Sequence, residues 1–353
     1  MSRESRVPPN QGGYSPVRAE DAAEVMDLLL GFVKTQSVNT AIKLGIPDLV
    51  AQGPVTSETV ARHCGTDVHS TSRLLRCLAS IGVLDETKNH EFMATRISSA
   101  ILSSQPGSIA AYVRFVADYT FTSASHIDAI MTSGSSGDAF LQANGKSFFE
   151  LLATDPQAGL MFDSAMAVTS TGFREGFLEY DWSKVSHVID VGGGSGALLT
   201  SLLSRYPHLR GTLCEQAHVL EEANSVLSAA QVEDRCTLKV CDFFKEIPSG
   251  GDVYILARVL HDWDDTKASA ILGRVYDAMT ADGRMLIADQ VLSDSPGSHW
   301  SKVYNLFITL LLSGNERTEG DWRALLSDSK FTLNRIRKAG WRSEILECTP
   351  QKG

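Results

Sequence analysis

The stretch that decides the fold is residues 188–196, which read Val-Ile-Asp-Val-Gly-Gly-Gly-Ser-Gly. An apolar run typical of a buried strand leads into a glycine-rich turn, and a helical stretch follows the turn. Glycine allows the main chain to approach a ligand where a Cβ atom would collide. The turn alone does not identify its ligand. Gly192, Gly194 and Ala197 also satisfy the G-x-G-x-x-A fingerprint of a dinucleotide site. A tight turn that binds nothing is a further alternative.

The sequence around this turn alternates short apolar strands with helices. Beyond Asp181, strand-like runs are separated by helical stretches, among them residues 265–279 and a late helix from Val303 onward. Such alternation predicts a parallel, doubly wound sheet with its chemistry at the carboxyl ends of the strands.

The N-terminal part of the chain has a different pattern. Helical spacing of apolar residues is followed by two short helices, opened by Thr56 and Ser70, and by an alternating stretch that predicts a small β-wing. This is the outline of a winged helix. The predicted organisation is a disordered leader at 1–20, a winged-helix domain at 21–105, a helical linker and substrate-pocket segment at 106–180 that is interrupted by a glycine- and serine-rich tip at 132–138, and a catalytic domain at 181–353.

Charge and composition argue against several classes of partner. A winged helix can bind DNA, but the presumed recognition helix carries only Arg73 and Arg76, and 42 acidic against 32 basic residues give a net charge of −10. The sequence has no secretory signal and no apolar stretch long enough for a membrane span. Its six cysteines lack a CxxC pair, so we expect reduced thiols in a cytoplasmic protein, with Cys214 and Cys241 as small buried hydrophobic residues.

Successive strand ends carry groups suited to an adenosine ligand. Glu215 lies 21 residues beyond Gly194, at the end of the second strand, where a carboxylate can accept hydrogen bonds from ribose hydroxyls. Asp242 and Phe243 end the third strand and offer an acceptor and an aromatic face for adenine.

The fourth strand end carries a candidate general base. His261 stands at the mouth of the expected crevice, and an imidazole can take a proton near neutral pH. Asp289, at the next strand end, and Glu316 could orient its other ring nitrogen. A histidine with two such carboxylates indicates catalysis.

These motifs resemble those of the small-molecule O-methyltransferases, typified by plant caffeic acid O-methyltransferase and by bacterial enzymes that tailor phenazines and polyketides. DVGGGSG at 190–196, LHDWDD at 260–265 and GNERT at 314–318 stand in that family's order and spacing. Residues 145–166 are similar to the family's linker. The resemblance covers residues 25–348, nearly the whole chain.

The resemblance implies an α/β fold in which a C-terminal Rossmann-like methyltransferase domain follows a mainly helical, winged-helix dimerisation domain. It implies a homodimer that binds S-adenosyl-L-methionine and methylates a hydroxyl, expected to be phenolic, of a small secondary metabolite, in a transfer that needs no metal. It also implies roles for particular residues: His261, Asp289 and Glu316 in catalysis; Asp190, Gly192, Gly194, Glu215, Asp242, Phe243, Arg258 and Trp263 at the cofactor; and Phe162, Met166, Asp262, Asn305 and Ile308 at the substrate.

Some positions depart from the family pattern. Asp289 stands where many relatives carry glutamate, Asn305 replaces a frequent aspartate, and Ile308 replaces a frequent methionine. The last two changes indicate an acceptor different from the plant phenylpropanoids. Core packing is an alternative role for Phe162 and Ile308.

Three alternative functions remain open at this point. A metal-dependent C-methyltransferase of a keto acid would use His261 and Asp262 with His299 as a third ligand. A relative that retains the cofactor could instead catalyse hydroxylation or a pericyclic rearrangement. A DNA-binding regulator that senses a metabolite is disfavoured by the acidic charge.

Overall fold

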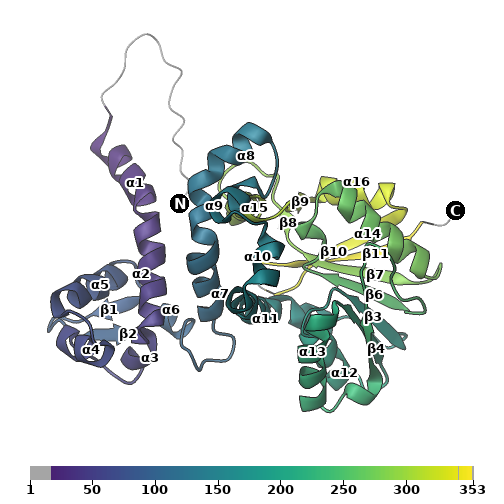
Figure 1. Cartoon of the computed structure of the whole chain (residues 1–353), viewed down its shortest axis with the longest axis horizontal. Coiled ribbons are helices and arrows are strands. Elements are labelled where there is room, and N and C mark those ends of the chain that lie inside the picture. The colour runs from purple at the N-terminus through teal and green to yellow at the C-terminus, as the bar shows by residue number, and fades with distance from the viewer. Residues whose placement is uncertain (1–16, 341, 352–353) are drawn as a thin grey trace, which may run out of the picture. The chain divides into compact units, whose positions relative to one another are not determined.

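The computed structural model describes residues 17–340 and 342–351, apart from the side chains at 170 and 171. Its residues form two compact units, the first ending at Ser103 and the second beginning at Ser104 (Figure 1). Most of the predicted leader, residues 1–16, lies outside the described residues. The last part of that prediction is wrong, because helix α1 already begins at Ala19.

The first unit is a set of helices with a two-stranded wing. Its helices are α1 (Ala19–Leu29), α2 (Gly31–Lys43), α3 (Ile46–Val50), α4 (Ser57–Cys64), α5 (Val68–Ser80) and α6 (Arg96–Ser99). The wing is the antiparallel pair β1 (Leu84–Glu86) and β2 (Phe92–Ala94). The predicted winged-helix outline is therefore present.

One of the two predicted helix starts needs correction. Thr56 caps α4, since its side chain accepts a hydrogen bond from the Thr59 amide. Helix α5 is capped by Asp67, whose carboxylate accepts from the Ser70 amide at 2.8 Å, and not by Ser70 itself. An aspartate caps a helix as well as a serine does, so the helix begins earlier than predicted.

The second unit opens with helices. They are α7 (Ala110–Phe115), α8 (Ile127–Ser133), α9 (Asp138–Asn144), α10 (Phe148–Thr154) and α11 (Pro156–Leu178), with a π-helical turn η1 (Val116–Thr120) and a 3-10 turn η2 (Phe121–His126) after α7. The predicted tip is present, because α8 ends at Ser133 and α9 begins at Asp138.

A seven-stranded sheet forms the body of the second unit (Figure 1). The strand order is β10-β11-β7-β6-β3-β4-β5. The strands are β3 (His187–Val191), β4 (Arg210–Glu215), β5 (Cys236–Val240), β6 (Val253–Ala257), β7 (Arg284–Asp289), β10 (Phe331–Lys338) and β11 (Glu344–Pro350). The helices around the sheet are α12 (Ala197–Arg205), α13 (Ala217–Ala229), α14 (Asp265–Ala278), α15 (Trp300–Leu311) and α16 (Glu319–Asp328). Four short elements complete the unit: the turns η3 (Glu233–Arg235) and η4 (Leu260–Asp262) and the strands β8 (Val291–Leu292) and β9 (Arg317–Thr318).

The expectation of an all-parallel sheet is wrong at one edge. Strands β3 to β7 pair in parallel as predicted, but β11 pairs antiparallel with β7, and β10 pairs antiparallel with β11. The few residues between β10 and β11 cannot hold a crossover helix, so these strands form a hairpin. Helix α15 also begins before the predicted Val303, at Trp300.

The sheet separates two apolar cores. Successive strand residues point to opposite faces, so Val188 packs with α11, α12 and α13, whereas Ile189 packs with α14 and α16. Tyr254 and Ile255 alternate in the same way on β6. The strands are thus fixed from both sides, and their carboxyl ends are held in place. None of the described helices is both long and apolar enough to cross a bilayer.

Candidate active site

The glycine-rich turn leaves β3 in a conformation that only glycine adopts freely. Gly192 has φ 69° and Gly194 has φ 55°. A Cβ at Gly192 would come within 3.0 Å of Val259 Cγ2 and 3.5 Å of the Phe243 ring, whereas a Cβ at Gly194 would meet nothing within 4 Å. The main chain at Gly194 therefore borders open space.

Two carboxylates follow the neighbouring strands. Glu215, at the end of β4, accepts from the Gly194 amide at 3.2 Å and so joins the glycine turn. Asp242, just beyond β5, accepts from the Phe244 amide at 3.1 Å, and its other oxygen lies 2.8 Å from Lys245 Nζ. Both side chains keep exposed surface for a ligand.

Aromatic rings stand beside these carboxylates. The Trp263 ring centroid lies 6.3 Å from that of Phe243 and 4.9 Å from that of Phe244. Since Phe243 also borders Gly192, the rings, the glycine turn and Asp242 surround one place. This arrangement suits an adenine ring.

Asp190 lies beneath the turn as a buried carboxylate. Neither of its oxygens has a hydrogen-bond partner among the described residues, and a Cβ at Gly193 would collide with its carboxyl group. Burial, with a smaller contribution from the charge of Glu215, raises the pKa of Asp190 to about 7. A buried acceptor without a partner and an open glycine turn are consistent with a ligand that supplies donors, so the residues fit an adenosyl cofactor.

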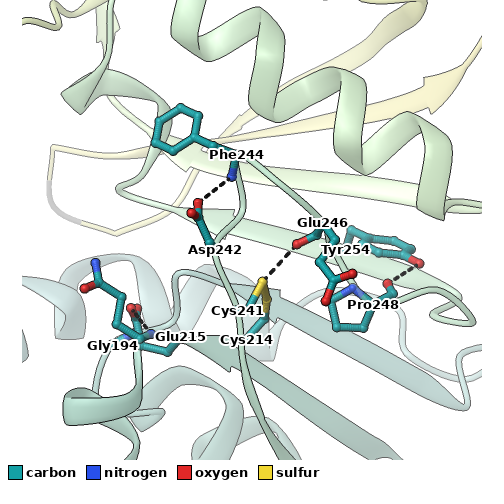
Figure 2. Close-up of a disulfide and its surroundings, with 10 residues drawn as sticks. Gly194, Cys214, Glu215, Cys241, Asp242, Phe244, Glu246, Pro248 and Tyr254 are labelled. Carbon is teal, nitrogen blue, oxygen red and sulfur yellow. Dashed lines mark hydrogen bonds between the residues drawn. A yellow bond between two sulfur atoms is a disulfide. The ribbon is translucent and has the colours of Figure 1, made fainter.

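A disulfide joins the end of β4, which carries Glu215, to the segment just beyond β5, which carries Asp242 (Figure 2). Cys214 and Cys241 are buried and bonded, with Cα atoms 5.3 Å apart. The expectation of reduced thiols is therefore wrong for this pair. The two cysteines are distant in sequence, and only the parallel pairing of β4 with β5, extended by the Cys241 amide bond to the Glu215 carbonyl, brings them together.

His261 is buried in η4 and held at both ring nitrogens. Nδ1 lies 3.0 Å from Glu316 Oε1, and Nε2 lies 3.2 Å from Asp262 Oδ1. Burial and the charge of Arg258 lower the pKa of His261, but the three carboxylates Asp262, Glu316 and Asp289 outweigh them, so the pKa lies above its ordinary value. The site favours an imidazolium.

The two predicted supporting carboxylates differ in the structure. Glu316 contacts His261 directly. Asp289 is fully buried at the end of β7, and neither of its oxygens has a hydrogen-bond partner among the described residues. Burial raises the pKa of Asp289 to about 7 against the opposing charge of His261. Asp289 thus forms no hydrogen bond with His261, and the second contact comes from Asp262, predicted as a substrate residue.

Arg258 leaves β6 with a strained main chain. Its φ of 59° costs an L-residue about 1–2 kcal/mol. The guanidinium donates to the Tyr304 hydroxyl on α15 at 2.8 Å. Its predicted contact with the cofactor remains a prediction, because the side chain is directed to Tyr304.

Comparison with known proteins identifies the family. Residues 125–332 match the family model of the O-methyltransferase domain, and residues 26–104 match that of the O-methyltransferase dimerisation domain. The chain belongs to the O-methyltransferase family. It is 35% identical to the mitomycin biosynthesis 6-O-methyltransferase of Streptomyces lavendulae, over 95% of each chain, and 34% identical to the phenazine O-methyltransferase PhzM of Lysobacter antibioticus, over 97% of this chain and 98% of that one.

The structural relatives agree. Human N-acetylserotonin methyltransferase, solved in complex with S-adenosylmethionine, superposes with a TM-score of 0.85 at 26% identity, covering 96% of this chain and all of that one. The cofactor of this O-methyltransferase is S-adenosyl-L-methionine, and the glycine turn, Glu215 and Asp242 are the residues present that fit it.

The predicted substrate residues of the O-methyltransferase have different surroundings. Phe162 packs against Phe115 at a ring-centroid distance of 5.3 Å and, with Met166, joins a cluster in which Ile308 is buried. Asn305 Oδ1 accepts from the Glu316 amide at 2.8 Å, so Asn305 fixes the loop that carries the partner of His261. The sequence did not single out its neighbour Tyr304, although an aromatic residue beside Asn305 on the same helix was a visible signal.

His299, the candidate third metal ligand, caps α15. Its Nδ1 accepts from the Ser301 amide and lies 2.7 Å from the Ser301 hydroxyl. Within the described part of the O-methyltransferase, no three His, Cys, Asp or Glu side chains are grouped so that they could hold a metal ion.

Proposed function

We propose that this enzyme transfers a methyl group from S-adenosyl-L-methionine to a hydroxyl oxygen of an aromatic small molecule, with His261 as the general base. The observation that carries the proposal is the contact between His261 Nδ1 and Glu316, which leaves Nε2 as the nitrogen that can accept a proton. An ionised carboxylate can only accept a hydrogen bond, so the hydrogen of this contact lies on Nδ1.

The surroundings of His261 suit a base better than an acid. When Nε2 takes the hydroxyl proton, the imidazolium lies between Glu316 and Asp262, and both carboxylates stabilise its charge. The acceptor hydroxyl replaces Asp262 as the partner of Nε2 before the transfer. General-base assistance of this kind contributes about 10²–10⁴-fold to the rate.

The cofactor residues act by binding and orientation. Glu215 and Asp242 hold the adenosine, with Phe243 and Trp263 beside the adenine, and Asp190, Gly192 and Gly194 hold the methionine part. When bound, S-adenosyl-L-methionine supplies an electrophilic methyl group on a sulfonium centre. Holding the acceptor in line with that methyl group lowers the barrier further.

An aromatic acceptor is supported by the side chains around the base. Phe162, Met166 and Tyr304 belong to one cluster and keep part of their surface exposed. Two related proteins are named a mitomycin biosynthesis 6-O-methyltransferase and a phenazine O-methyltransferase. The acceptor class proposed is therefore a phenolic secondary metabolite, as part of an antibiotic pathway in the cytoplasm.

Assembly as a homodimer is part of the proposal and is supported by the match of residues 26–104 to the dimerisation domain. In this proposal the first unit serves assembly and the second unit carries the chemistry.

The names of two relatives describe reactions other than O-methylation, so the acceptor atom must be identified by experiment. One is named phenazine-1-carboxylate N-methyltransferase and another aclacinomycin 10-hydroxylase RdmB, each 30% identical to this chain. Product analysis by mass and NMR after incubation with methyl-labelled cofactor separates the three outcomes, since only O-methylation gives a labelled methoxy group.

Replacing the base tests the mechanism. In H261N we expect turnover to fall by about 10²–10⁴-fold, while calorimetry finds the affinity for S-adenosyl-L-methionine unchanged. The matched control is H299N, which retains a good helix cap and should keep native turnover. Native turnover in H261N would refute the base, and loss of turnover in H299N would favour the metal-dependent alternative.

A further inference from the structure

Arg258 is a half-buried cation that lacks a carboxylate partner. Its Nη2 donates to the Tyr304 hydroxyl at 2.8 Å, and its Cζ lies 5.8 Å from the Tyr304 ring centroid. No carboxylate in the described part of the chain forms an ion pair with it. A guanidinium presents five N–H donors in a planar fork, so Arg258 retains donors for a ligand.

Arg317 shows how this fold satisfies an arginine that is only structural. Arg317 is 1% exposed, pairs with Asp265 at 2.8 Å, and donates to the carbonyls of Leu260 and Trp263. The N–H groups on every side of the Arg317 guanidinium therefore donate to protein acceptors. Arg258 differs because it has one bond and keeps exposed surface.

Two tyrosine hydroxyls stand beside Arg258. The Tyr304 oxygen accepts from Arg258, so the Tyr304 hydrogen is left to donate. Tyr112 interacts electrostatically with Tyr304 and Arg258, and both tyrosines pack at the edge of the aromatic cluster with part of their surface exposed. One cation and two phenolic hydroxyls therefore lie together against apolar walls.

The direct contacts of His261 and Arg258 are made with different groups, although their charges interact. The ring nitrogens of His261 are contacted by Glu316 and Asp262, whereas Arg258, three residues earlier, is contacted by neither. An anion at Arg258 would lie close to the base without displacing its partners. A guanidinium fork matches the two oxygens of a carboxylate.

We propose that Arg258, with Tyr304 and Tyr112, binds a carboxylate of the acceptor, so that the preferred acceptors are aromatic hydroxy acids. The inference rests on the proposed function, because it assigns the hydroxyl at His261 and the carboxylate at Arg258 to one molecule. The main-chain strain at Arg258 is consistent with a position kept for ligand binding.

The test compares acids with their neutral amides. The probes are 3-hydroxy-2-naphthoate and the three hydroxybenzoates, each paired with its carboxamide, titrated at pH 7.5 into the full chain saturated with S-adenosylhomocysteine. We expect at least one acid to bind about 10- to 100-fold more tightly than its amide. In R258M the preference should disappear, and in R258K it should fall, because lysine keeps the charge and loses the fork.

Controls separate this role from others. R274M alters an exposed arginine and should keep the native preference. Y304F should weaken acid binding while amide binding stays unchanged. A preference that survives in R258M, or the absence of any preference across the panel, overturns the inference. An unchanged acid-to-amide ratio with weaker S-adenosylhomocysteine binding in R258M also overturns it and assigns Arg258 to the cofactor.

Methyl transfer to the same panel keeps the two proposals distinguishable. Equal transfer to acids and amides leaves the proposed function intact and refutes the carboxylate site. Acid binding that depends on Arg258, without transfer to any hydroxyl oxygen, refutes the proposed function and leaves the carboxylate site.

Discussion

His261 must be neutral before it can accept a proton, and its carboxylate neighbours favour the charged form. Because its pKa lies above the ordinary value, kcat/KM should rise with pH through a midpoint above that of a free histidine. Asp262 is one of the groups that raise this pKa. In D262N we therefore expect the rising limb to move to lower pH by about 1 unit.

The measurement is kcat/KM from pH 5 to 9 for the native enzyme, D262N and the exposed control D282N. D282N should follow the native profile. If the midpoint of the rising limb is the same in D262N and in the native enzyme, the titrating group is not His261. This conclusion does not depend on the absolute rates.

Asn305 determines where Glu316 lies. Its side chain accepts from the Glu316 amide at 2.8 Å, so N305L leaves that amide without a partner and loosens the carboxylate that holds His261. We expect kcat to fall by about 10- to 100-fold in N305L, as for other lost partners of buried groups. N305D keeps an acceptor but adds negative charge, so its rising limb should move to higher pH and its rate at pH 9 should approach native.

A pH-independent loss of rate in N305D as large as that in N305L would contradict this role. The contact between His261 and Glu316 could be predicted from the sequence, whereas the role of His261 as the base remains a prediction. The order of strand ends does not say which carboxylate points at which ring nitrogen. For that reason the sequence predicts Asp289, and not Asp262, as the second carboxylate at His261.

At the scale of elements, prediction succeeded where the pattern was local. The parallel strands and the glycine turn have short-range signals, namely apolar runs followed by residues with free main-chain conformations. Strands β10 and β11 escaped prediction because FTLNRIRK, the β10 sequence, carries charged residues at the open edge of the sheet. The disulfide was not predicted because its two cysteines meet only through strand pairing.

The disulfide should stabilise the cofactor end of β4 and β5. It closes a loop between cysteines 27 residues apart, and limiting the freedom of such a loop in the unfolded chain is worth about 3 kcal/mol. In C214A/C241A we expect a lower free energy of unfolding in urea and a weaker affinity for S-adenosyl-L-methionine, since Glu215 and Asp242 directly follow the two cysteines. Adding a reductant should also lower the free energy of unfolding and the cofactor affinity of the native enzyme. It should change neither quantity in the variant.

Thiol titration of the denatured, unreduced native chain provides the check. Four free cysteines are expected, and six reactive thiols would contradict the disulfide.

At the scale of the molecule, each unit has buried apolar residues of its own. Val60, Leu75 and Phe92 are buried in the first unit, while the two cores of the second unit lie on either face of its sheet. The residues proposed to bind the cofactor all belong to the second unit. Ligand binding should therefore stabilise the second unit directly.

A thermal scan with two ligands tests this expectation. At 100 times its Kd, S-adenosyl-L-methionine should stabilise the second unit by about 2.7 kcal/mol, which raises its unfolding temperature by roughly 5–10 °C. NAD at the same concentration should have little effect, because Glu215 and Asp242 fit a single adenosine and the open turn at Gly194 would have to cradle a pyrophosphate. Intrinsic fluorescence of Trp182 and Trp322, both buried in the second unit, reports its unfolding. A larger shift with NAD would overturn the assignment of the glycine turn, and no shift with either ligand would place the cofactor elsewhere.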